Sequence, residues 1–129
     1  MNYTDINSIL LVRMPELKSA IEKEYEWWNG EEPPPHCLYE SAFNHSGFMR
    51  DLLFEEINIT LINKVFDFFE DMANCDDYEV RCLLKVTLLE YLWGDFDLLN
   101  RAHKYMHTKT RELCDELQVY FKPFTPEQP

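Results

Sequence analysis

Apolar residues recur every three or four positions along almost the whole chain, which is the spacing of one face of an α-helix. Only three glycines occur, and the turn signals of β-hairpins between alternating apolar runs are missing. The pattern predicts an all-α fold of about six to seven helices. The expected helices cover residues 4–14, 15–28, 36–53, 58–73, 78–93, 95–106 and 108–121.

Prolines and glycines mark the ends of several of these helices. Pro15 suits the first position of a helix, and Gly94 suits the position just after one. Gly47 is a weak point within residues 36–53, so residues 44–47 form either a kink or a short loop. The helix over residues 78–93 is apolar on nearly all sides, which predicts a central position buried by several neighbours.

The length of 129 residues suits a single domain, with enough apolar (46%) and aromatic (15%) residues for a sizeable core. Residues 31–37 are a proline-rich linker between helices, and residues 122–129, with two prolines, are expected to be a frayed tail. Short turns between helices favour antiparallel pairs, arranged as a compact bundle or as a short HEAT-like stack. No repeat period distinguishes the two.

Negative charge is concentrated in residues 31–79. This segment has two basic and twelve acidic side chains, a net charge of −10, whereas the whole chain has −12. Such a surface attracts basic proteins over about 8–10 Å and repels nucleic acid and anionic membranes. Because no secretory signal or membrane-spanning run is recognisable, we expect a cytoplasmic protein whose four cysteines are reduced thiols.

Some of these carboxylates are expected to share helical faces. Helical spacing places Glu40, Asp51 and Glu55 on one face and Asp67, Glu70 and Asp71 on another. Like charges at i and i+4 destabilise a helix, so an unbalanced face suggests a binding surface rather than a solvated one. Asp76 and Asp77 are capping residues by the simpler interpretation, but a capping aspartate stays exposed. The candidate partner-binding residues are therefore Glu40, Asp51, Glu55, Asp67, Glu70, Asp71, Asp76 and Asp77.

No motif indicates catalysis or a cofactor. His103 and His107 have the i, i+4 spacing of a metal clamp, but they lack the glutamate and the third ligand of known sites. His36 and Cys37 are adjacent, but nothing orients them as a nucleophile and its base. We therefore expect no enzymatic activity, no metal and no cofactor.

Four segments carry a resemblance to a known class of proteins. They are residues 14–17 (Met-Pro-Glu-Leu), the acidic proline-rich linker ending at Leu38, residues 66–74 (Phe-Asp-Phe-Phe-Glu-Asp-Met-Ala-Asn) and residues 80–95. Together they resemble small, acidic, all-helical bacterial proteins, some of which are immunity proteins of contact-dependent growth-inhibition and other polymorphic toxin systems. The matching residues are core and capping residues, so the resemblance implies the fold and assigns no contact residues.

The charge and the resemblance together predict an immunity protein that binds a cognate toxin, such as a basic nuclease domain, and covers its active groove. Its partner would be a protein, not nucleic acid or a membrane, and the chain itself a monomer or weak dimer. Two alternatives stay open: a nucleic-acid mimic that inhibits a defence nuclease, and a non-catalytic helical adaptor or scaffold whose charge serves solubility.

Overall fold

Helices account for every regular element in residues 1–121, the part of the chain described by this computed structural model. The predicted all-α fold is confirmed. The predicted frayed tail, residues 122–129, lies outside the described residues.

The helices follow one another in this order: α1 (Ile6–Arg13), a 3₁₀ turn (Pro15–Leu17), α2 (Lys18–Trp27), α3 (Pro35–Tyr39), the π-helix η2 (Glu40–His45), α4 (Phe48–Glu55), α5 (Ile59–Ala73), α6 (Tyr78–Cys82), the π-helix η3 (Leu83–Leu89), α7 (Glu90–Leu92), α8 (Phe96–His103), α9 (Thr108–Glu116) and α10 (Gln118–Phe121). Because α3 runs directly into η2, residues 35–45 form one continuous helix. In the same way α6, η3 and α7 form one helix over residues 78–92.

Gly47 ends the helix that the sequence predicted over residues 36–53. Its φ is +83°, in the left-handed region that favours glycine, and α4 starts one residue later. The prediction of one continuous helix is therefore wrong, and the alternative of a break within residues 44–47 is confirmed.

Helix 78–92 and α5 occupy the centre of the molecule. The π-helical part of helix 78–92 packs against α3, η2, α5 and α9, so its predicted central position is confirmed. On α5, Phe66 and Phe69 lie edge to face with ring centroids 5.3 Å apart, and Phe69 meets Phe43 of η2 in the same way at 5.4 Å. These rings are almost fully buried, so the core joins the middle helices into one unit.

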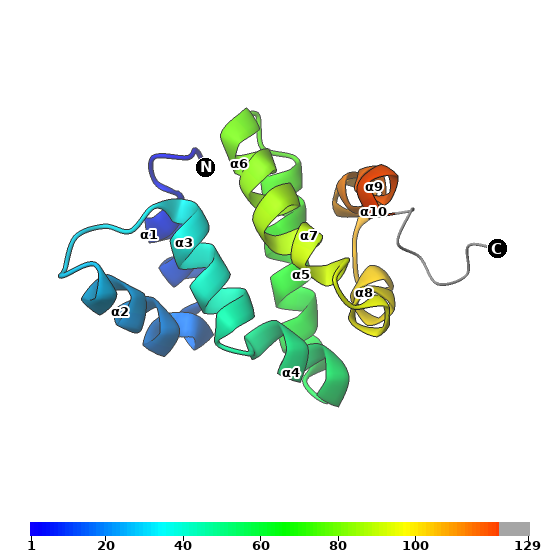
Figure 1. The fold of residues 1–129 in the computed structure, drawn as a ribbon, viewed down its shortest axis with the longest axis horizontal. Coiled ribbons are helices and arrows are strands. Elements are labelled where there is room, and N and C mark those ends of the chain that lie inside the picture. The colour runs from blue at the N-terminus through cyan, green and yellow to red at the C-terminus, as the bar shows by residue number, and fades with distance from the viewer. Residues whose placement is uncertain (122–129) are drawn as a thin grey trace.

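The remaining helices flank this centre. Figure 1 shows the α1–α2 pair at one end and α8, α9 and α10 at the other. The proline-rich linker lies against α1, where Asn7 Nδ2 donates to the Pro33 carbonyl at 2.9 Å. The buried Tyr39 hydroxyl donates to the Ile6 carbonyl at 2.6 Å and joins α3 to α1. Within residues 1–121, no helix is long and apolar enough to cross a membrane.

Candidate functional site

The three carboxylates predicted to share one face of α5 turn to different neighbours. Asp67 contacts His107 Nε2 at 2.9 Å, on the side of α9, whereas Asp71 pairs with Arg13 of α1 at 2.7 Å. In Figure 1, α1 and α9 lie on opposite sides of α5. The three carboxylates keep their helical spacing on α5, but each is engaged by another part of the chain, so they do not form a free acidic surface.

Glu70 holds the start of α9 in place. Its Oε1 accepts hydrogen bonds from the Thr110 backbone amide and hydroxyl, both at 2.9 Å, and its Oε2 accepts from the Lys109 amide at 3.0 Å. Partial burial raises the pKa of Glu70, but these hydrogen bonds outweigh it and leave the pKa below its ordinary value. Because free amides at a helix start need acceptors, Glu70 acts as a cap supplied by another helix.

A second carboxylate, that of Glu56, stabilises the same end of the molecule. The sequence analysis did not select it as a candidate. Glu56 accepts hydrogen bonds from Lys104 Nζ at 3.0 Å and from the Tyr105 hydroxyl at 2.9 Å, and Arg101 lies 3.6 Å away. The hydrogen bonds from Lys104 and Tyr105 lower the pKa of Glu56. The acidic middle of the chain is thus partly neutralised by cations from its C-terminal helices.

Glu40, Asp51 and Glu55 do not share one helical face, because the turn at Gly47 separates η2 from α4. Glu40 contacts His45 Nε2 at 2.9 Å. Asp51 and Glu55 are exposed, and neither has a hydrogen-bond or ion-pair partner on its carboxylate among the described residues. Of this predicted set, these two carboxylates remain available for a partner.

Asp77 caps α6, as the simpler interpretation of the sequence predicted. Its Oδ1 accepts from the Glu79 amide and its Oδ2 from the Tyr3 amide, both at 2.9 Å. The hydrogen bond from Tyr3 is the main cause of its lowered pKa. Asp76 is exposed and its carboxylate has no partner within residues 1–121.

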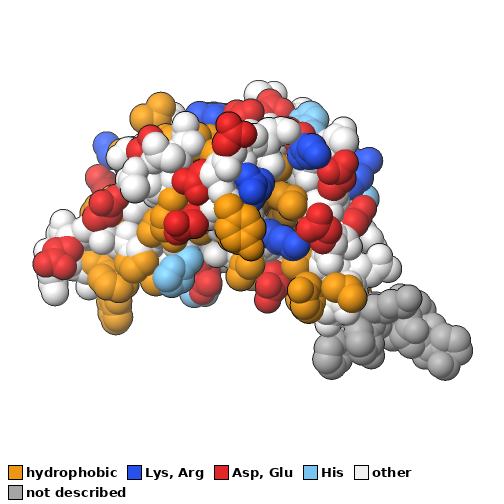
Figure 2. Space-filling view, turned by 90° about the horizontal axis from the view of Figure 1, so that it is seen from above, with side chains coloured by type: hydrophobic (Ala, Val, Ile, Leu, Met, Phe, Trp, Pro, Cys, Tyr) orange, Lys and Arg blue, Asp and Glu red, His pale blue; other side chains and the backbone are white. Residues whose placement is uncertain are grey.

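A groove runs between helix 35–45 and helix 78–92. One hollow of about 400 Å³ is lined by residues that include Glu40, Val86 and Glu90, and a second of about 260 Å³ adjoins it at Glu79 and Cys82. Both hollows share Val86, so they form one continuous depression, called the η2–η3 groove below. In Figure 2, which looks down on the top of Figure 1, the lower edge of the molecule carries apolar, acidic and histidine side chains.

The two π-helices face each other across this groove. Asn44 of η2 is nearly fully buried, and its Nδ2 donates to the Thr87 carbonyl of η3 at 3.2 Å. A π-helix leaves backbone carbonyls out of the regular helical ladder, and such segments occur frequently at functional sites. Helical periodicity does not reveal them, so sequence reasoning missed this pair.

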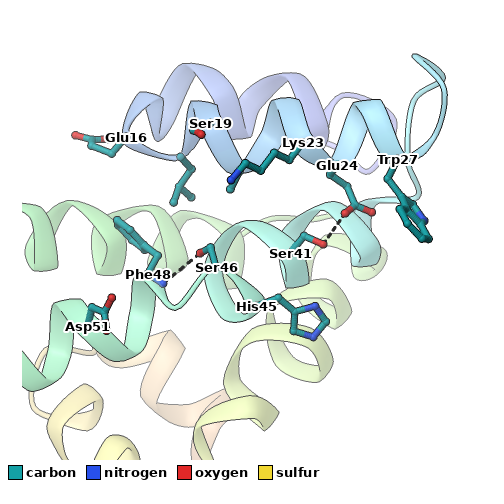
Figure 3. Close-up of a pocket in the computed structure, with 12 residues that line it drawn as sticks. Glu16, Ser19, Lys23, Glu24, Trp27, Ser41, His45, Ser46, Phe48 and Asp51 are labelled. Atoms are coloured by element: carbon teal, nitrogen blue, oxygen red, sulfur yellow. Dashed lines mark hydrogen bonds between the residues drawn. The ribbon is translucent and has the colours of Figure 1, made fainter.

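A wider cleft of about 610 Å³ opens on the other side of η2, between it and α2 (Figure 3). Glu24 spans the cleft, accepting hydrogen bonds from the Ser41 hydroxyl at 2.7 Å and from Trp28 Nε1 at 2.8 Å. Trp27 lies at the end of α2 with 80% of its surface exposed. Because Lys23 and Asp51 both line it, this cleft has no single sign of charge.

The residues considered for metal binding or catalysis do not come together as a site in the fold. His103 contacts Asp115 at 3.1 Å, whereas His107 contacts Asp67, so the two histidines do not share a ligand position. Burial, followed by the nearby glutamates, raises the pKa of Cys37, the opposite of what an activated nucleophile needs. Within residues 1–121, no three His, Cys, Asp or Glu side chains lie close enough together to hold a metal ion.

Fold and surface together define an all-helical acidic domain with an open groove and exposed carboxylates. Residues 7–121 match the family described as DUF7674, a domain of unknown function, and the chain belongs to that family. No curated protein and no solved structure matches the chain. The family description assigns no activity, so the resemblance to immunity proteins stays a prediction.

Proposed function

We propose that the protein acts by binding a basic protein partner, without catalysing a reaction, and that it is an immunity protein that neutralises a toxin domain. Its net charge of −12 would speed the encounter with a cationic partner. Affinity would come from apolar side chains that are exposed on the free protein.

The observation that carries the proposal is the composition of the η2–η3 groove. Glu40, Glu79 and Glu90 line it, together with the apolar Val86, and no lysine or arginine is among the described residues that line it. Val86 is 58% exposed, although it lies on a central helix of the molecule. An apolar centre with an acidic rim is suited to a partner whose apolar anchors are surrounded by cations.

The alternative of a nucleic-acid mimic is less well supported. Such a mimic presents many free, regularly spaced carboxylates in place of phosphates. Five of the eight candidate carboxylates instead bind donors of the chain itself: Glu40, Asp67, Glu70, Asp71 and Asp77. A helical adaptor would use the same groove and differs only in that binding would not neutralise the partner.

Co-expression tests the proposal. The basic domain encoded by the neighbouring gene is expressed alone and together with this chain, and cell growth is measured. We expect the domain to be toxic alone, growth to be restored by the chain, and the purified pair to associate more slowly as salt is added. A neighbour that is harmless, or toxic but unaffected by the chain, contradicts an immunity function; a complex without rescue favours the adaptor.

A further inference from the structure

We propose that the η2–η3 groove receives one amphipathic α-helix of the partner, with an apolar centre and lysine or arginine near both of its ends. This inference rests on the proposed function and deepens it, because it assigns the surface and the shape of the element that is bound.

The exposed strip of helix 78–92 shows which pattern the partner must match. Glu79, Cys82, Val86 and Glu90 follow one another at helical spacing and all line the groove. From Glu79 to Glu90, the four side chains of this strip are therefore acidic, apolar, apolar and acidic. Glu40 adds a third carboxylate from the opposite wall, where it contacts His45 Nε2 at 2.9 Å.

The cations of helix 78–92 do not neutralise this strip, because each is engaged elsewhere. Lys85 Nζ donates to Glu116 at 2.6 Å, toward α9. Arg81 donates to the Cys75 carbonyl at 2.6 Å and lies over the Tyr78 ring. A partner helix would therefore meet carboxylates at both ends of the groove without competing lysines or arginines.

A helix fits this groove better than an extended segment does. Extended segments are usually bound through the free backbone groups of a sheet edge, and the described part of the chain has no strand. A helix satisfies its own backbone hydrogen bonds and needs only side-chain contacts from the groove. Glu79 and Glu90 are eleven positions apart, which corresponds to about three turns or about 16 Å along a helix, so the partner's cations should be separated by a similar length.

The test uses a synthetic helical peptide as the probe. It is about four turns long, with leucines on one face and a lysine near each end, eleven positions apart. A peptide of the same composition, in which the leucines no longer share a face, is the control. Binding to the whole chain is measured by fluorescence anisotropy, and the binding site is located from amide shifts in NMR spectra.

We expect the amphipathic peptide to bind with shifts concentrated in residues 35–45 and 78–92, and the scrambled peptide to bind more weakly. Val86→Arg should weaken binding by about tenfold or more, because it places a cation in the apolar centre. The matched control Val119→Arg changes an exposed valine of α10 outside the groove and should leave binding unchanged. The double variant Glu79→Gln/Glu90→Gln should bind more weakly and lose much of its salt dependence, even if Val86→Arg proves unstable.

Equal binding of both peptides, unchanged affinity in the groove variants, or shifts located on other helices overturns the assignment. The co-expression result separates this outcome from a failure of the proposed function. If the chain neutralises its partner while the groove variants do so equally well, the partner is bound elsewhere and only the groove assignment is wrong. If the peptide binds in the groove but no partner is neutralised, the immunity function is wrong and the groove assignment stands.

Discussion

Replacing Glu70 with glutamine separates a structural role from a binding role for the acidic residues of α5. The Glu70 carboxylate accepts hydrogen bonds from the Thr110 amide and hydroxyl and from the Lys109 amide, while Asn74 Nδ2 donates to it at 3.1 Å. A glutamine keeps one acceptor oxygen and turns an NH₂ group toward the other donors. Glu70→Gln therefore weakens the hydrogen bonds that fix the start of α9.

The expected loss follows from these contacts. A net hydrogen bond contributes about 1 kcal/mol, and one to a charged group contributes more. Thr110 is fully buried, so water cannot readily replace the lost acceptor. With two bonds lost or weakened, the free energy of unfolding should fall by about 2 kcal/mol, which corresponds to about 6–10 °C in Tm for a chain of this size.

Urea denaturation followed by circular dichroism measures this change. Glu55→Gln is the matched control, because Glu55 is exposed and its carboxylate has no partner within the described residues. The control should alter the free energy of unfolding by less than about 0.5 kcal/mol. If Glu70→Gln and Glu55→Gln are equally stable, the assignment of Glu70 as a cap for α9 is wrong.

Three further predictions concern stability. Because the pKa values of Glu56, Glu70 and Asp77 are lowered in the folded protein, the unfolded chain binds more protons in acid. The free energy of unfolding should therefore be constant above about pH 5 and fall as the pH drops toward 3. Glu70→Gln should make this fall smaller, and urea titrations at each pH measure it. Gly47→Ala forces a side chain into the left-handed region at φ +83° and should cost about 1 kcal/mol in the same assay; an unchanged midpoint would show that this turn is not strained. Asp71→Asn removes an exposed ion pair with Arg13 and should cost less than about 1 kcal/mol, and a larger loss would mean that this pair has a structural role.

The positions of the helices could be predicted from the sequence because each element has an apolar stripe of helical period. The Gly47 break was visible as a weak point, although only the structure decides between a kink and a turn. The π-helical segments could not be predicted, because one extra residue in a turn barely alters the period of residues 40–45 or 83–89.

The roles of the acidic residues were beyond local sequence reasoning. The contact between Asp67 and His107 and that between Glu70 and Thr110 each join residues 40 positions apart. Counting charges within residues 31–79 therefore found an excess of negative charge. It could not find the positively charged groups from other parts of the chain that contact these carboxylates in the fold. Glu79 and Glu90 carried a usable signal, since they are the two acidic residues of helix 78–92.

Amide hydrogen exchange on the complex with the proposed protein partner tests the central claim most directly. Exchange is compared between the free chain and the complex, peptide by peptide. A partner seated in the η2–η3 groove should slow exchange in residues 35–45 and 78–92 and leave α9 unchanged. Slowed exchange confined to α8, α9 and α10, with both groove helices unaffected, would contradict the account.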